Sequence, residues 1–278
     1  MVDILREMLT YPFLTRALIV GTLVALCAAL LGTSLVLKRY AMIGDGLSHV
    51  GFGALALATV LNLQPLAVTI PVVVAAAFLL LRLSENSKVK GDSAIAMIAT
   101  GSLAVGVMLV SLSGTNTDLN AFLFGSILSM RREDVVLSAI LSAAVLVLYV
   151  LFYNKLFAVT FDETFARAAG IGAGRYTMLL ALLTAVTVVL GMRMMGSLLI
   201  SALILFPALS AMRVCRTFRS VTVCAAVVSV VSFVAGLVLS YRLETPTGAS
   251  VVVVGIGIFL IFCLAGALRG RSGAGARP

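Results

Sequence analysis

The chain has 278 residues, of which 62% are hydrophobic and 11% are charged, and its 20 Lys and Arg against 11 Asp and Glu give a formal charge of +9. Soluble domains carry about 25% charged and about 45–50% apolar residues, so the composition excludes a soluble enzyme and a disordered chain. The basic residues stand singly between apolar runs, which excludes a clustered nucleic-acid-binding surface. The sequence therefore predicts a multi-pass protein in contact with membrane lipid, with the positive excess acting as an orientation signal.

Apolar runs of about 20 residues are long enough to cross roughly 30 Å of hydrocarbon as helices. The sequence predicts an all-α transmembrane bundle of eight or nine spans, of which the second and the seventh are short and interrupted. We assign the spans to residues 14–37, 45–62, 65–83, 93–113, 133–154, 175–192, 196–212, 219–240 and 248–268. The apolar stretch 119–130 is too short to cross and is predicted to be a surface or re-entrant helix. The transmembrane domain is thus expected over residues 14–268.

The distribution of Lys and Arg predicts the orientation. If segment 1–13 is extracytoplasmic, fourteen of the 20 basic residues fall on one side of the membrane, which the positive-inside rule makes cytoplasmic. The Gly- and Arg-rich tail 269–278 is then a cytoplasmic segment that we expect to be disordered. Region 160–175 is also cytoplasmic and too polar to lie in lipid.

Region 160–175 contains the signals of a short helix. Thr160 or Asp162 is the candidate N-cap, Glu163 falls in the first turn, and Gly170 is the candidate stop. These signals fit a simple connecting loop, and they also fit a docking element for a partner protein.

One acid and the single histidine of the chain fall inside a predicted span. Asp45 and His49 are four residues apart, so on a helix they share one face. Two structural explanations are open: a mutually neutralising pair, or Asp45 acting as an N-cap between two glycines. The third is a metal-ion site, since carboxylate and imidazole suit zinc, manganese and iron(II). Two ligands are too few for a closed structural site but fit an ion that must also leave.

The sequence lacks the motifs of the catalytic alternatives. The residues before Asp45 do not form the G-x-G-D of an intramembrane aspartyl protease. Ser113-Gly114 is preceded by Ser111-Leu112, so this pair does not form the G-x-S-G of a rhomboid-type protease. No G-x-x-x-x-G-K-[S/T] is present, so the chain has no P-loop of its own. We expect a transport protein that is not itself an enzyme.

Five segments in this order resemble the membrane permease subunit of zinc-, manganese- and iron-type ABC importers. The segments are DGLSH (45–49), LFG (123–125), FDETFARAAG (161–170), LISALILFPA (199–208) and LSYRLETPTG (239–248). The resemblance implies a bundle similar to the cobalamin and siderophore permeases, in the bacterial inner membrane. It also implies a homodimer or a pair with a paralogous permease, a cytoplasmic ATP-binding dimer and an extracytoplasmic metal-binding protein. The cargo would be Zn, Mn or Fe(II), with no permanently bound cofactor.

The resemblance also assigns roles to residues. Asp45 and His49 match the positions that meet the metal in the pathway. Asp162, Glu163, Ala166 and Gly170 lie in the segment that couples to the ATPase. Pro207 interrupts its span and is predicted to kink it, and Gly248 is predicted to free the backbone in a turn before the last span.

Two other kinds of transporter remain as alternatives at this point. One is a siderophore or cobalamin permease of related architecture, and the other is an ATP-independent metal-ion channel or carrier. The first needs no metal ligands in its pathway. The second is often built from internal repeats, and no convincing repeat occurs in this sequence.

Overall fold

The structure is a computed structural model that describes residues 12–86, 91–113, 125 and 132–274. Within these residues all regular structure is helical, and nine helices are long and apolar enough to cross a membrane, which confirms the predicted all-α bundle. The nine are α2 (Pro12–Leu37), α3 (Ile43–Val60), α4 (Pro65–Asn86), α5 (Gly91–Ser113), α7 (Arg132–Leu151), α10 (Ala173–Met195), α11 (Ser197–Val214), α12 (Phe218–Leu243) and α13 (Thr247–Ala274).

Two short helices, α8 (Tyr153–Phe161) and α9 (Glu163–Ala168), connect α7 to α10. The predicted helix at 119–130 lies outside the described residues except for Gly125, as do residues 1–11 and 275–278. The last helix continues past Leu268, where the predicted span ended, to Ala274.

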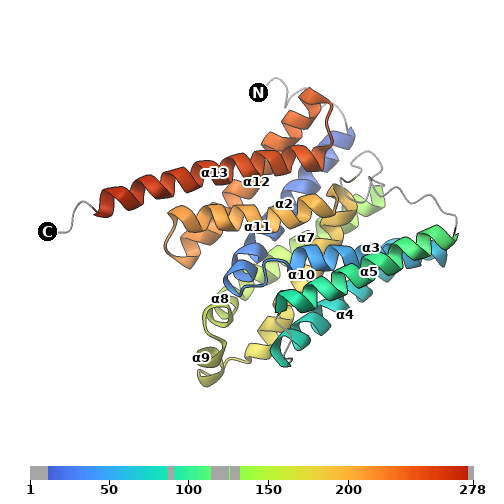
Figure 1. Cartoon of the computed structure of the whole chain (residues 1–278), viewed down its shortest axis with the longest axis horizontal. Helices are drawn as coiled ribbons and strands as arrows, with labels where there is room; N and C mark the ends of the chain where they lie inside the picture. Colours follow the sequence, from blue (N-terminus) through green and yellow to red (C-terminus); the bar gives the residue numbers. More distant parts are fainter. Residues whose placement is uncertain (1–11, 87–90, 114–124, 126–131, 275–278) are drawn as a thin grey trace.

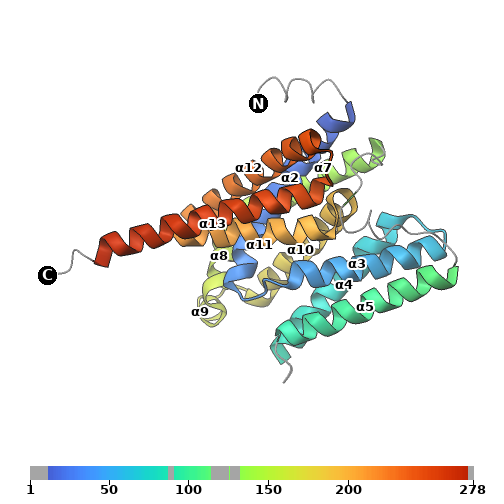
Figure 2. The same cartoon turned by 45° about the horizontal axis from the view of Figure 1, so that its top comes forward.

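The helices form a central group with a three-helix layer beside it. α2 packs against α10, α11 and α12, while α3, α4 and α5 pack on one another along one side of the molecule (Figures 1 and 2). α13 lies against α11 and α12, and its C-terminal end extends beyond the other helices. α5 and α13 are therefore the least buried of the spans, and α10 and α2 are the most buried.

One end of the bundle carries most of the described basic side chains, and we call it the basic end. It contains the end of α2, helices α8 and α9, the start of α10, the end of α11 and the start of α12. Lys38 after α2 contacts Glu163 of α9 and Thr177 of α10, and Tyr153 of α8 stacks on Phe218 of α12, which ties these termini together.

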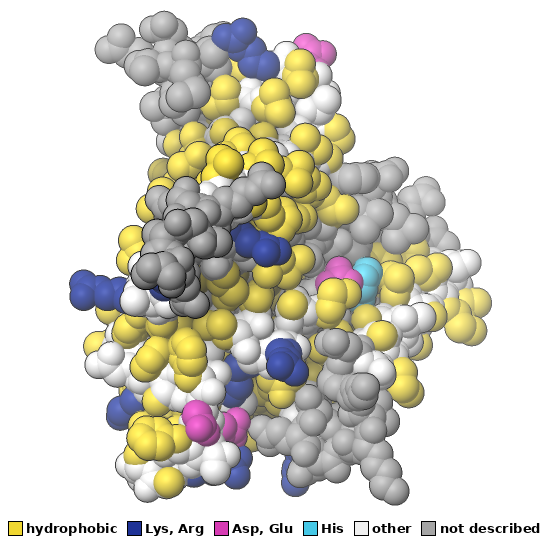
Figure 3. Space-filling view, turned by 60° about the vertical axis from the view of Figure 1, so that its left-hand side comes forward, with side chains coloured by type: hydrophobic (Ala, Val, Ile, Leu, Met, Phe, Trp, Pro, Cys, Tyr) yellow, Lys and Arg dark blue, Asp and Glu magenta, His cyan; other side chains and the backbone are white. Residues whose placement is uncertain are grey.

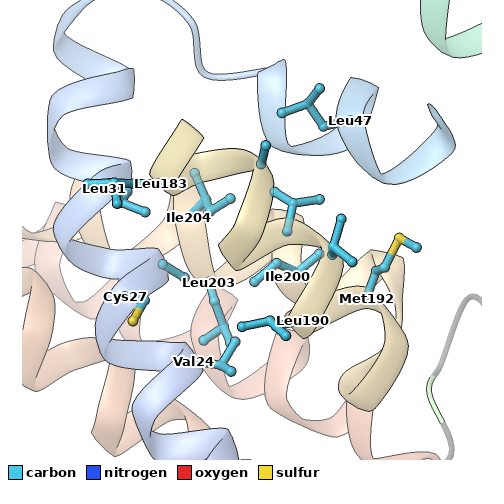
Figure 4. Close-up of a cluster of buried hydrophobic side chains, with 14 of the residues drawn as sticks. Val24, Cys27, Leu31, Leu47, Leu183, Leu190, Met192, Ile200, Leu203 and Ile204 are labelled. Atoms are coloured by element: carbon cyan, nitrogen blue, oxygen red, sulfur yellow. The ribbon is translucent and has the colours of Figure 1, made fainter. Parts of the chain in front are cut away.

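The core lies where α2 meets α10 and α11. Val24, Cys27 and Leu31 of α2 face Leu190 of α10 and Leu203 of α11, as Figure 4 shows. Transmembrane helices gain no hydrophobic driving force against one another, so close packing of small and branched side chains holds them together.

The closest helix approach in this core requires a glycine. Gly32 of α2 lies directly against the backbone carbonyl of Ile204 in α11, and Gly44 at the start of α3 lies against the Ile204 side chain. Because glycine has no side chain at these two positions, both α2 and α3 can pack closely against Ile204 of α11. This packing fixes the start of α3 beside α11.

We expect the replacement Gly32→Ala to lower thermal stability. The added Cβ would collide with the Ile204 carbonyl group, which is backbone and has little room to move. Overpacking of this kind costs about 1–3 kcal/mol, and thermal unfolding of the detergent-purified protein would measure it. Gly257→Ala in α13 is the matched control, because a Cβ there meets nothing within 4 Å. Equal melting temperatures for the two variants would contradict the packing argument.

The turn before α13 differs from the prediction. Gly248 was expected to free the backbone there, but it is buried and is the second residue of α13. The left-handed residue is Glu244, with φ 52°, which ends α12. The chain has therefore already turned before Pro246, and Gly248 is not needed for the turn.

Candidate metal site and coupling region

Asp45 and His49 lie on the same face of α3, as their spacing predicts. His49 Nε2 is 3.6 Å from Asp45 Oδ2. The Ser201 hydroxyl of α11 lies 3.1 Å from the Ser197 carbonyl oxygen of its own helix and 3.4 Å from Asp45 Oδ1, and it can donate its hydrogen to either oxygen. The N-cap of α3 is Met42, and no side chain caps this helix end. The hypothesis that Asp45 is an N-cap is therefore wrong, because the carboxylate lies inside the first turn and turns toward His49 and Ser201.

Asp45 lies in the first turn of α3, but its carboxylate is level with Ser201 inside α11, four residues after the start of that helix at Ser197 (201 − 197 = 4). Its partner Ser201 is thirteen residues before Val214, the end of α11 at the basic end (214 − 201 = 13). At 1.5 Å per residue this places Ser201 about 20 Å from that end of the helix. An ionisable pair at this depth is costly to place and is by default a candidate functional site.

The pair opens into a cavity of about 320 Å³ between α3 and α5. On α3 the cavity is lined by the pair and by Met42 and Gly46, and on α5 by small or apolar side chains that include Ala96 and Thr100. The Asp45 side chain is 45% exposed and that of His49 22%. Asp45 is thus only half buried, although the sequence placed it inside a span. On the face in Figure 3 a histidine lies beside an acidic side chain, and the chain has one histidine.

The separation of the two side chains fits two ligands of one ion. Ligands held at about 2.1 Å in a tetrahedral site are about 3.4 Å apart, close to the 3.6 Å between His49 Nε2 and Asp45 Oδ2. A direct hydrogen bond between these atoms would be shorter. Among the described residues no group of three or more His, Cys, Asp or Glu lies close enough together to hold a metal ion.

The other predicted pathway residues lie elsewhere. Pro207 is buried inside α11 and faces α12 and α13, where it lines a cavity of about 10 Å³ with Ser232 and Gly255. Gly248 lies in the first turn of α13. Neither residue lines the cavity beside Asp45. The sequence analysis in turn missed Ser201, whose only signal is its place in the LISALILFPA segment.

Region 160–175 folds as predicted. Asp162 is the N-cap of α9, and its carboxylate accepts a hydrogen bond of 2.9 Å from the Phe165 backbone N–H. Thr160 instead lies inside α8, where its hydroxyl donates to the Leu156 carbonyl. Gly170 has a φ of +80°, which suits a residue after a helix end because a side chain there would be strained.

α9 is fixed by a buried alanine and an acidic residue. Ala166 is fully buried against Val159 of α8 and Ala173 of α10. Glu163 accepts a hydrogen bond from Arg167 at 2.7 Å and pairs with Lys38 at 3.4 Å. Lys38 in turn donates to the Thr177 hydroxyl at 3.2 Å, and its side chain is 9% exposed. Lys38 therefore links α9 and α10 to the connection between α2 and α3, a contact that the sequence did not predict.

The surroundings of Glu163 keep it ionised. Partial burial acts to raise the pKa of this carboxyl group, but the hydrogen bond from Arg167 and the charge of Lys38 together outweigh it. The net result is a pKa below the ordinary value of 4.5. Glu163 is therefore ionised at neutral pH.

The fold and the site define a class of protein: a multi-pass helical membrane protein with a carboxylate–imidazole pair inside its bundle and a structured polar region at one end. Residues 10–266 match the model of the ABC 3 transport family, and the chain belongs to this family. The chain is thus a multi-pass protein of the bacterial inner membrane.

Relatives and a solved structure agree with the family. The chain is 30% identical over 268 residues to the "Probable iron transport system membrane protein" of Haemophilus influenzae, covering 94% of this chain and 96% of the relative. It is 30% identical over 256 residues to the "Manganese transport system membrane protein MntC" of Halalkalibacterium halodurans, covering 92% and 88%. The structure resembles PsaBC from Streptococcus pneumoniae in complex with Fab, with a TM-score of 0.83 and 29% identity over 94% of each chain. The resemblance noted in the sequence is confirmed.

Proposed function

We propose that the chain is the membrane-spanning subunit of an ATP-driven importer of a divalent transition-metal ion. The observation that carries this proposal is the Asp45–His49 pair, which faces a cavity at membrane depth with the spacing of two metal ligands. Membership of an ABC transport family supports it, as do relatives named for iron and manganese transport. The iron and manganese relatives are equally similar to the chain, so neither metal is favoured over the other. Carboxylate and imidazole also suit zinc, so zinc, manganese and iron(II) all remain as cargo.

A second permease subunit would complete the site. Two ligands from one chain fall short of the four or more that transition metals take in proteins. A two-fold axis beside α3 and α5 would bring a second Asp45 and a second His49 to the same ion. Few residues of α5 are buried in the single chain, which supports a partner on the face formed by α3 and α5. The partner would be another copy of the chain or a paralogous permease.

The basic end would face the cytoplasm and bind the ATPase. This orientation follows the positive-inside rule, and ABC transport requires a subunit that hydrolyses ATP, for which this chain has no P-loop. α9 offers a contact surface there, because Phe165 is 69% exposed and Arg167 lies one turn from the helix start. The opposite end would receive the ion from an extracytoplasmic metal-binding protein.

The alternatives fit the site less well. A siderophore or cobalamin permease has no need for a carboxylate and an imidazole 3.6 Å apart. An ATP-independent channel or carrier has no need for an ATPase-binding region, and the chain belongs to an ABC transport family.

Uptake in cells lacking their own importers would test the function. The chain would be expressed with the ATPase and the binding protein encoded beside it, and entry of Zn, Mn and Fe(II) measured in parallel. We expect uptake of at least one metal that requires all three components and stops when the ATPase is inactivated. Uptake that persists without ATP hydrolysis would favour the channel or carrier. Failure of every metal in an assembled complex would favour an organic substrate.

A further inference from the structure

A second cavity, of about 690 Å³, lies between α2, the α7–α8 junction and the start of α12. It is at the basic end of the bundle and does not share a lining residue with the cavity beside Asp45. Its lining changes character along its length: hydroxyl groups and a guanidinium group stand on one side and valine side chains on the other.

The polar side contains groups without partners. The Tyr149 side chain is 1% exposed, and its hydroxyl has no hydrogen-bond partner of standard geometry among the described residues, although Ser34 and Thr222 lie nearby. This hydroxyl is fully buried beside Ser34 and Thr222, so Tyr149 presents its ring and not its hydroxyl to the cavity. Arg219 also lines this cavity, and among the described residues no acid pairs with it.

The charge and the hydroxyl groups stand close together. Arg219 lies near the Tyr153 ring, and Tyr153 follows Tyr149 by one helical turn. A guanidinium group with neighbouring hydroxyl donors matches the oxygens of a phosphate group, which accept several hydrogen bonds at once.

The apolar side opens toward the membrane. Val150 of α7 is 68% exposed and Val223 of α12 is 58% exposed, and both line the cavity. Val147 and Val227, one turn deeper on the same two helices, are also exposed. Arg219 is the second residue of α12, so the cavity crosses from headgroup level into hydrocarbon level.

We propose that this cavity binds an anionic phospholipid of the leaflet at the basic end. Arg219 and the Tyr153 hydroxyl hold the phosphate group, and the acyl chains follow the surface formed by Val150 and Val223. Basic pockets between helices are a known means of binding acidic headgroups. A free phosphate ion shares the headgroup chemistry but makes no use of the apolar side.

Lipid retention by the purified full-length permease in its complex would test the assignment. The complex would be placed in nanodiscs of one part phosphatidylglycerol to four parts phosphatidylethanolamine, then extracted into mild detergent, and the lipid retained per permease counted by native mass spectrometry. We expect phosphatidylglycerol to be enriched in the wild type and its retention to fall at least five-fold in Arg219→Gln. Tyr153→Phe, which keeps the ring, should lower it by a smaller factor.

Arg216→Gln is the matched control, since Arg216 is equally basic and exposed but does not line the cavity. Its retention should equal that of the wild type, and melting temperatures would establish that all variants fold. If Arg216→Gln and Arg219→Gln lowered phosphatidylglycerol retention equally, the retention would depend on general surface charge and not on this cavity. That result would overturn the proposal. Displacement of the retained lipid by millimolar inorganic phosphate would identify the ligand as a soluble phosphate and also overturn it.

Discussion

Replacing Asp45 with Asn, or His49 with Ala, is expected to lower the rate of metal uptake at least about ten-fold. Each change removes one of the two ligand groups that the described part of the chain offers at this site. Losing a group that merely orients a ligand already costs 10–100-fold in metal affinity, so losing the ligand itself should cost at least as much. In a homodimer each replacement would remove two ligands from one ion.

Initial rates of radiolabelled metal uptake, corrected for the amount of permease in the membrane, would measure the effect. Asp45→Asn is preferred to alanine because it removes the charge but keeps the shape. Ser201→Ala should give an intermediate loss, since the Ser201 hydroxyl can donate to the carboxylate or to the Ser197 carbonyl of its own helix. Glu244→Gln removes an exposed acid at the far end of α12 and is the control that should leave uptake unchanged.

The uptake rates of these variants test the assigned site separately from the proposed transport function. Normal uptake in both Asp45→Asn and His49→Ala would leave the transporter in place but reduce the pair to a structural contact. A loss in both variants that is accompanied by poor folding would be resolved by Ser201→Ala, which removes a single hydroxyl group. Ser201→Ala should fold normally and still transport more slowly.

The sequence predicted the spans and the pairing of Asp45 with His49 because both depend on local spacing. Apolar run lengths determine which segments cross the membrane, and residues four apart share a helical face wherever the helix lies. The Asp162 cap and the Gly170 stop were predicted for the same reason, since helix ends are decided within a few residues.

Contacts between distant segments could not be predicted in this way. Ser201 reaches Asp45 only because Gly32 and Gly44 let α2 and α3 approach Ile204 of α11. Lys38 looked like an ordinary membrane-border residue, and its link to Glu163 spans 125 positions. The role given to Gly248 failed because a neighbouring residue, Glu244, adopted the left-handed conformation instead.

The second large effect is expected from Lys38→Gln, which should uncouple ATP hydrolysis from transport. Lys38 holds α9 through Glu163 and α10 through Thr177, and only the connection 38–42 separates α2 from α3, whose first turn carries Asp45. A movement of α9 imposed by the ATPase would therefore reach the metal site through this residue. Hydrogen bonds to charged groups contribute about 1.5–3 kcal/mol, so we expect the number of ions transported per ATP to fall about ten-fold.

The link should be insensitive to pH in the physiological range. A carboxyl group whose pKa is lowered on folding stabilises the folded state above its ordinary pKa and loses that contribution as the pH falls through the lowered value. Because the pKa of Glu163 lies below 4.5, the Glu163 carboxylate stays ionised from about pH 5 upward. A change of coupling between pH 6 and 8 would need another titrating group.

Arg167→Gln is the control that separates the link from the general charge of α9. Arg167 also pairs with Glu163, at 2.7 Å, but its side chain is 63% exposed and it does not touch the α2–α3 connection. Exposed ion pairs contribute about 0–1 kcal/mol, so this variant should keep most of the coupling, and Lys38→Arg should restore part of it. The measurement is ATP hydrolysis and metal uptake on the same proteoliposomes. If Lys38→Gln and Arg167→Gln lowered the number of ions transported per ATP equally, the motion of the ATPase would be passed on through its contact with α9 and not through Lys38.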